Sequence, residues 1–221
     1  MSGLLRSLKY ATFRAGRVIG ICLLMAVAFV FYFAFLNGDA FSVQNLIPRF
    51  PFMLLVVGNL MFMIYGMLDV ATYTQLTLTY GCTRKNAAIS TVYMHLLQIA
   101  AIELVMALCC VWIPRAWMEV SGGALCLLSL GLFLFGSGLA LTVGILIHRF
   151  GKIAYIIVVI IASLCGGVVG GVVGARGGSG GLLALVFSLL NLKVLLLIGV
   201  IWYAAMALAY WFFIRKIEVR V

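Results

Sequence analysis

Four polar residues inside two long apolar runs are the strongest candidates for chemistry in this sequence. His95, Gln98 and Glu103 lie in one run, and Asn59 lies in the run before it. Polar and ionisable side chains are costly in hydrocarbon, and where they occur they often line a substrate path or a proton relay. The alternative is polar contact between two helices, with Glu103 protonated. The residue types leave both open.

The depth of these residues suggests one pairing. At about 1.5 Å per helical residue, Glu103 lies about 20 Å from the cytoplasmic start of its run. Asn59 reaches a similar depth from the outer side, so Asn59 and Glu103 could hydrogen-bond across adjacent helices. Asp69 lies beside the end of its run, where we expect the cytoplasmic boundary and water.

Catalytic motifs are missing from the chain. It has no Walker A loop, no H-E-x-x-H, no G-x-S-x-G and no G-x-G-x-x-G between a strand and a helix. It has only two histidines, and its six cysteines lack the C-x-x-C spacing of a zinc site. We therefore expect no catalytic residue, no metal site and no cofactor bound by this chain, which is not an enzyme.

The composition indicates that most of the protein surface faces lipid. Hydrophobic residues make up 66% of the 221 residues and charged residues only 9%, which is far from a soluble domain. The formal charge of +10 does not indicate nucleic-acid binding, because the basic residues lie singly or in pairs beside apolar runs. We expect one membrane domain, residues 1–221, in contact with lipid.

The fold class follows from the apolar runs. A bilayer core of about 30 Å needs about 20 apolar residues in a helix, and unpaired backbone is too costly there for other forms. The sequence predicts an all-α polytopic protein with six spans. They are 18–36, 52–76, 89–113, 124–147, 153–173 and 194–214.

Basic residues predict the orientation. With the N-terminus inside, eleven Lys and Arg lie on the cytoplasmic side: Arg6, Lys9, Arg14, Arg17, Arg84, Lys85, Arg149, Lys152, Arg215, Lys216 and Arg220. Four lie outside: Arg49, Arg115, Arg176 and Lys193. Because cytoplasmic loops carry the excess of positive charge, we expect both termini in the cytoplasm.

Two further elements are expected beside the spans. Residues 1–16 place leucines on one side of a helical wheel and basic residues on the other, as in an amphipathic helix lying in the cytoplasmic interface. Residues 182–192 are apolar but too short to cross, which favours a short re-entrant or outer helix.

Glycines dominate the end of the fifth predicted span. Gly166, Gly170 and Gly174 are spaced four apart, so one face of this helix is almost bare backbone. Such a face lets another helix approach closely. It can serve packing within the chain or an interface between subunits.

The linker between spans two and three carries the most informative pattern. Residues 80–86 (YGCTRKN) combine Gly81, which permits a turn, with Thr83, Arg84 and Lys85. This segment resembles the G-x-T-R-K element between the second and third spans of small six-span permease subunits of type-2 ATP-binding-cassette (ABC) exporters. The similarity of architecture covers nearly the whole chain.

The resemblance implies a coupling role for Gly81, Thr83, Arg84 and Lys85. They would dock on a cytoplasmic ABC ATPase subunit, which binds ATP and Mg, while this chain supplies half of the substrate pathway. The second half would be another copy or a paralogue, and the resemblance implies a bacterial plasma membrane.

Two other functions stay open. One is a solute-binding membrane subunit or a small proton-coupled secondary transporter that uses Glu103 and His95. The other is a non-transporting membrane protein, such as a sensor or assembly factor.

Overall fold

The computed structural model describes residues 3–36, 46–74, 78, 82–114, 121–151, 153, 156 and 191–215. In this part of the chain all regular structure is helical. Five helices are long and apolar enough to cross a membrane: α1 (Gly3–Leu36), α3 (Phe50–Leu68), α5 (Arg84–Trp112), α6 (Gly122–Phe150) and α9 (Leu192–Arg215). They match five of the six predicted spans. Almost all of predicted span 153–173 and of the short element 182–192 lies outside the described residues.

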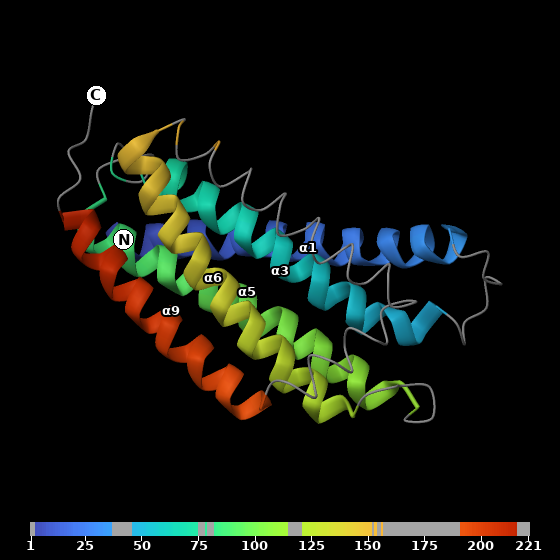
Figure 1. Cartoon of the computed structure of the whole chain (residues 1–221). Helices are drawn as coiled ribbons and strands as arrows, with labels where there is room; N and C mark the ends of the chain where they lie inside the picture. The colour runs from blue at the N-terminus through green and yellow to red at the C-terminus, as the bar shows by residue number, and fades with distance from the viewer. Residues whose placement is uncertain are drawn as a thin grey trace.

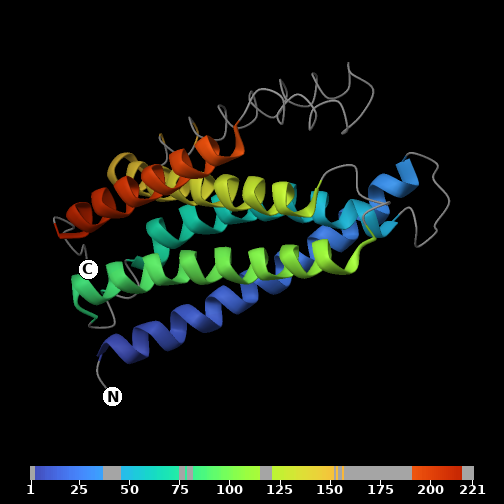
Figure 2. The same cartoon turned by 90° about the horizontal axis from the view of Figure 1, so that it is seen from below.

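The helices form a bundle with α5 and α6 at its centre (Figures 1 and 2). Figure 2 shows α1 along one edge and α9 along the other. The starts of α1 and α5 lie at the same end of the bundle as the ends of α6 and α9 (Figure 1). We call this the basic end, because Arg84, Lys85, Arg149 and Arg215 lie there, beside the basic first half of α1.

Helices α6 and α9, which pack side by side, run in the same direction. The contacts between them advance together along both helices: Gly131 with Leu195 and Leu196, Gly138 with Trp202 and Tyr203, and His148 with Phe213. By contrast, α5 and α6 are antiparallel, since Glu103 meets Ser129 and Cys110 meets Cys126.

The first helix corrects one expectation. We predicted a separate interfacial helix over residues 1–16, followed by a span from Val18, but α1 is a single helix of 34 residues. Its buried side is one continuous stripe that crosses the predicted break: Ala11, Ala15, Val18, Cys22, Ala26, Val30 and Ala34. Small residues at three- and four-residue intervals let α1 pack closely on α3 and α5 along its length. This packing keeps the amphipathic half in line with the span.

The second span begins and ends irregularly. A 3-10 turn, η1 (Ile47–Arg49), leads into α3, and prolines are tolerated in these first turns because their missing N–H has no helical partner there. At its other end, α3 passes into a π-helical turn, η2 (Asp69–Tyr73). Single π-helical turns are rare and occur frequently at functional sites.

The remaining helix ends have ordinary causes. The hydroxyl of Thr83 accepts from the backbone N–H of Asn86 at 3.3 Å and caps α5, and Ser121 caps α6 through Ala124 at 3.4 Å. Gly151, with φ of 64°, ends α6 in a backbone conformation that side-chain-bearing residues rarely adopt.

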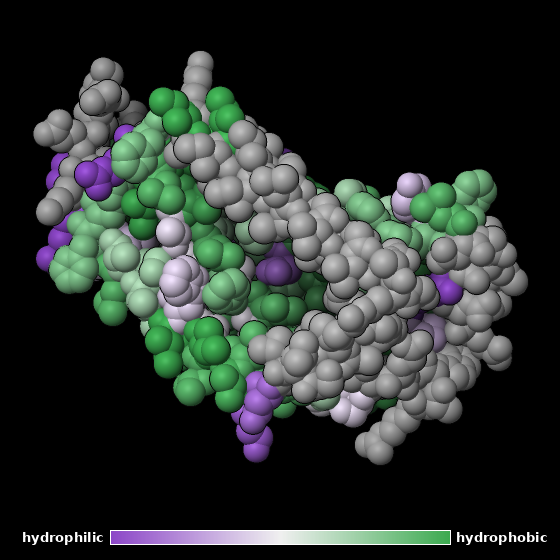
Figure 3. Space-filling model, in the orientation of Figure 1, coloured by the Kyte–Doolittle hydropathy of each residue, from purple (hydrophilic) through white to green (hydrophobic). Residues whose placement is uncertain are grey.

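The outward faces of the helices are apolar. Leu24, Phe35, Val111, Trp112 and Leu208 are each at least 60% exposed. Hydrophobic residues also cover much of the described surface in Figure 3. Together with the length of the helices, these faces define the chain as a polytopic helical membrane protein.

Candidate functional site

The buried face of α5 carries a polar column. Ser90, Thr91, His95 and Gln98 are each no more than 2% exposed, and their spacing places them along one side of the helix. Two of the residues predicted to form a polar pathway, His95 and Gln98, therefore lie inside the bundle. Ser90 and Thr91, which extend the column toward the basic end, were not singled out from the sequence.

His95 lies against the backbone of α3. A Cβ atom placed on Gly66 would be 3.1 Å from Cε1 of His95 and 3.3 Å from its Nε2, so glycine leaves the space that the imidazole fills. Neither ring nitrogen of His95, nor Nε2 of Gln98, has a hydrogen-bond partner among the described residues. Buried polar atoms of this kind are uncommon in native structures, and they frequently mark functional groups or bound water.

Asn59 and Glu103 do not pair as we expected. The side chain of Asn59 projects onto α6, where a Cβ on Gly136 would collide with its amide oxygen. Glu103 instead faces Ser129, whose hydroxyl oxygen lies 3.0 Å and 2.8 Å from the two carboxylate oxygens. Similar depth was not enough to identify the partner, because the direction in which each side chain leaves its helix also decides it.

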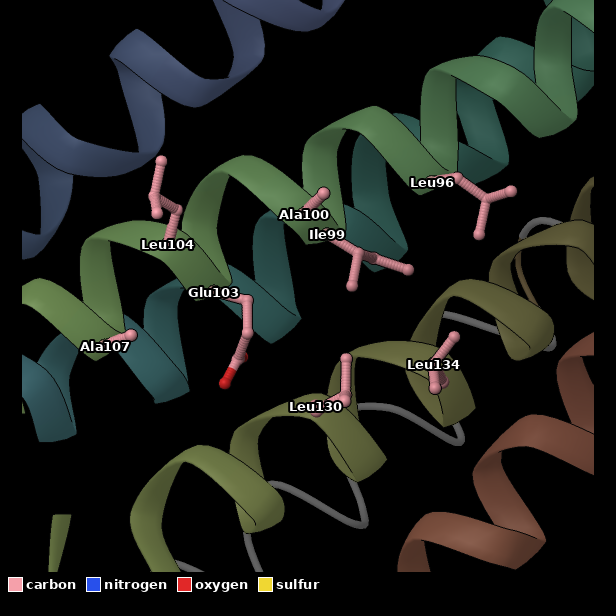
Figure 4. Close-up of a pocket in the computed structure, with 8 residues that line it drawn as sticks. All are labelled: Leu96, Ile99, Ala100, Glu103, Leu104, Ala107, Leu130 and Leu134. Carbon is pink, nitrogen blue, oxygen red and sulfur yellow. The ribbon is translucent and has the colours of Figure 1, made fainter. Parts of the chain in front are cut away.

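Glu103 opens onto a groove between α5 and α6 (Figure 4). The groove has a volume of about 560 Å³, and among the described residues that line it Glu103 is the charged one. Of the four residues predicted to form one pathway, the structure places Glu103 in this groove, His95 and Gln98 inside the bundle, and Asn59 against α6.

A second polar site, at the basic end, was missed by the sequence analysis. Arg14 of α1 forms an ion pair with Asp69, the first residue of η2, whose side chain is fully buried rather than solvated. The guanidinium of Arg14 also lies 5.2 Å from the centre of the Tyr73 ring. Tyr10 stacks on the same ring, with centroids 5.2 Å apart and planes within 6°. The four-residue spacing of Tyr10 to Arg14 and of Asp69 to Tyr73 was the available signal.

Hydroxyl groups continue this site into α9. The hydroxyl oxygen of Tyr210 lies 2.6 Å from that of Thr74 and 3.3 Å from that of Thr91. Thr91 also lies 3.0 Å from the carbonyl of Ala87, to which it donates. A hydroxyl can donate one proton and also accept, so the three hydroxyl groups form one hydrogen-bonded chain. The chain of bonds joins three segments: the end of η2, α5 and α9.

The predicted coupling residues lie at the same end. Thr83, Arg84 and Lys85 are exposed at the start of α5. Arg84 donates from Nη1 to the carbonyl of Arg215, the last residue of α9, at 2.7 Å. Gly81 lies outside the described residues, as do the glycines at the predicted helix-packing face: Gly166, Gly170 and Gly174.

Among the described residues, no group of three His, Cys, Asp or Glu side chains lies close enough together to hold a metal ion. The polar groups that the structure brings together are the buried side chains of α5, Glu103 with Ser129, and the ion pair of Arg14 and Asp69. Comparison with protein-family models, with curated proteins and with solved structures finds no match.

Proposed function

We propose that the chain is a permease subunit of an ATP-driven ABC exporter, as the resemblance of residues 80–86 implies. The protein performs no covalent chemistry of its own. A separate cytoplasmic subunit binds ATP and Mg and hydrolyses the nucleotide, and two permease chains, identical or paralogous, enclose the substrate path.

One observation carries the proposal. The exposed residues Thr83, Arg84 and Lys85 lie at the start of α5. Arg84 also donates a hydrogen bond to the carbonyl of Arg215, the last residue of α9. A partner that pushes on this turn therefore acts on two helices at once. Beneath it, the Tyr210 hydroxyl bonds tie α5 and α9 to the end of η2. Such contacts suit an element that turns closure of an ATPase into a rigid-body shift of the spans.

The proposal includes six spans. The shared direction of α6 and α9 supports this number, and the 151–191 segment is longer than the roughly 20 residues that one crossing needs. Six crossings put both termini on one side of the membrane.

The orientation is supported by charge. Of the described Lys and Arg residues, those of the first half of α1 and of the basic end form the larger group: Arg6, Lys9, Arg14, Arg17, Arg84, Lys85, Arg149 and Arg215. Arg49 and Lys193 lie at the opposite end. This asymmetry favours a cytoplasmic basic end in the plasma membrane, and the resemblance favours a bacterial one.

Copurification tests the proposal directly. The tagged chain, extracted in mild detergent from its native membrane, should bring with it a subunit that has ATPase activity. Reversing two charges in the motif, Arg84→Glu with Lys85→Glu, should release that subunit. Arg6→Glu with Lys9→Glu reverses two exposed charges on α1 and should leave the complex intact. Size-exclusion profiles of each variant would show that the fold survives. A wild-type chain that is purified intact without an ATPase would overturn the proposal.

A second candidate is supported by the partnerless ring nitrogens of His95 and the single carboxylate of the groove. A proton-coupled transporter would use these groups. It predicts transport in vesicles that follows a pH gradient without ATP and stops in Glu103→Gln.

A further inference from the structure

The groove between α5 and α6 combines aliphatic walls with one acid. Leu96, Ile99 and Leu104 from α5 face Leu130 and Leu134 from α6, and Glu103 lies among them. Figure 4 shows the Glu103 side chain directed into the space between the two helices. The volume, about 560 Å³, is within the range of small-molecule sites.

Glu103 has no cationic partner within the described part of the chain, where the pair of Arg14 and Asp69 is the salt bridge that occurs. Its carboxylate accepts a hydrogen bond from the hydroxyl of Ser129. That hydroxyl also lies 3.0 Å from the carbonyl oxygen of Cys126 and has one proton to share among three acceptors. The carboxylate therefore keeps unused capacity to interact with a positive group.

The groove opens on the apolar surface of the bundle. Leu96 and Leu104 at its rim are 46% and 62% exposed. Glu103 is nine residues from the end of α5 at Trp112, or about 13 Å along the helix, so the opening faces hydrocarbon and not water. A ligand reaches it through lipid, where only a shielded or delocalised charge is soluble.

We propose that this groove binds lipophilic monovalent cations, with the carboxylate of Glu103 as counter-ion and the leucine walls around the apolar body. An acid on an apolar wall selects this class, because a neutral molecule leaves the carboxylate uncompensated and an anion is repelled. As a binding site the groove stands by itself. As the place where the exporter takes its cargo it rests on the proposed function.

Tetraphenylphosphonium and tetraphenylborate are suitable probes, since they match in size and shape and differ in the sign of the charge. Binding of each is measured by equilibrium dialysis against the purified chain in lipid nanodiscs, with empty nanodiscs subtracted. We expect saturable binding of the phosphonium alone. Glu103→Gln should weaken it by about tenfold or more, since a charged partner in low dielectric is lost.

A steric variant keeps the test independent of the acid. Ala100→Phe fills the groove and leaves Glu103 in place, and it should abolish binding. Ala205→Phe adds the same bulk at an exposed position on α9 and should bind as the wild type does. The proposal is overturned if the wild type shows no saturable binding, if the borate binds equally, or if Glu103→Gln leaves phosphonium affinity unchanged in a protein that remains monodisperse.

This result is separable from the proposed function, because no ATPase is present in the nanodiscs. Binding that depends on Glu103 in a chain that never copurifies with an ATPase would support the site and reject the exporter. A copurifying ATPase with no cation binding would do the reverse.

Discussion

Arg14 and Asp69 form an ion pair that ties the first helix to the π-helical turn at the end of the second span. Asp69 is fully buried and Arg14 only 24% exposed, so the pair is largely withdrawn from solvent. The pair lies just before the linker that carries the proposed coupling residues. Any force on that linker is therefore shared with α1.

Removing the cation should destabilise the fold. Arg14→Met leaves the Asp69 carboxylate buried without its partner, which costs about 3–5 kcal/mol in comparable buried pairs. We expect a clear fall in the thermal midpoint, measured by size-exclusion chromatography of heated, detergent-solubilised protein. Arg17→Met, at an exposed position one turn further along α1, is the control and should behave as wild type.

A double variant distinguishes the interaction of Arg14 with Asp69 from the separate effect of each substitution. Arg14→Met with Asp69→Leu removes both charges and should melt above Arg14→Met alone, because no charge is left uncompensated. Strictly additive losses from the two substitutions would show that the residues do not interact.

The hydroxyl of Tyr210 makes a smaller contribution. Tyr210→Phe removes the hydroxyl that bonds to Thr74 and Thr91, at a cost of about 1 kcal/mol and a fall of about 2–4 °C in the midpoint. Tyr32→Phe changes an exposed ring and should leave the midpoint unchanged. Equal midpoints for the two variants would contradict the buried hydroxyl chain.

Close packing of α6 on η2 depends on Gly144. An added Cβ would lie 2.7 Å from Cγ1 of Val70, a stiff β-branched side chain that cannot easily move away. Gly144→Ala should therefore destabilise by about 1–3 kcal/mol. Gly123 lies on the same helix, and a Cβ added there would have nothing within 4 Å. Gly123→Ala should therefore be neutral or slightly stabilising. The thermal midpoints of the two alanine variants give the comparison, and a stabilised Gly144→Ala would show that η2 and α6 are further apart.

The register of α5 and α6 can be tested by oxidation. The sulfur atoms of Cys110 and Cys126 lie 3.9 Å apart, so a mild oxidant such as copper phenanthroline should join them with loss of two hydrogens. Peptide mass spectrometry of the digested protein would identify the cross-link. Cys110→Ser should abolish it and Cys109→Ser should not. A cross-link through Cys109 instead would mean that α5 is rotated about its axis.

The helices themselves were predictable because length and hydropathy alone decide whether a segment can cross a bilayer. Five of the predicted spans correspond to described helices. The break expected at Gly16 was wrong because composition changes there, from basic and amphipathic to apolar, while the buried stripe from Ala11 to Val18 does not. The spacing of the small residues indicated one continuous helix, but the change from basic to apolar composition suggested two separate elements.

The site was less predictable, since it depends on which faces of different helices meet. The sequence singled out Glu103 as a residue that needs a partner, whereas its contact with Ser129 depends on the antiparallel register of α5 and α6. Arg14 was assigned to an interfacial helix and Asp69 to a solvated position at the cytoplasmic boundary. The four-residue spacings of Tyr10 to Arg14 and of Asp69 to Tyr73 place each pair on one helix face, but only the tertiary contact between α1 and η2 brings the two faces together.

The contact of Gly131 with Gly199 has a mechanical consequence. A Cβ on Gly199 would be 2.7 Å from the carbonyl oxygen of Gly131, so at this point the two backbones touch with no cushion of long side chains between them. Side chains can absorb a sliding motion by changing rotamer, whereas backbone contacts cannot. We therefore expect α6 and α9 to move together without sliding along each other. Relative motion in the bundle should occur instead where these two helices contact the others through side chains.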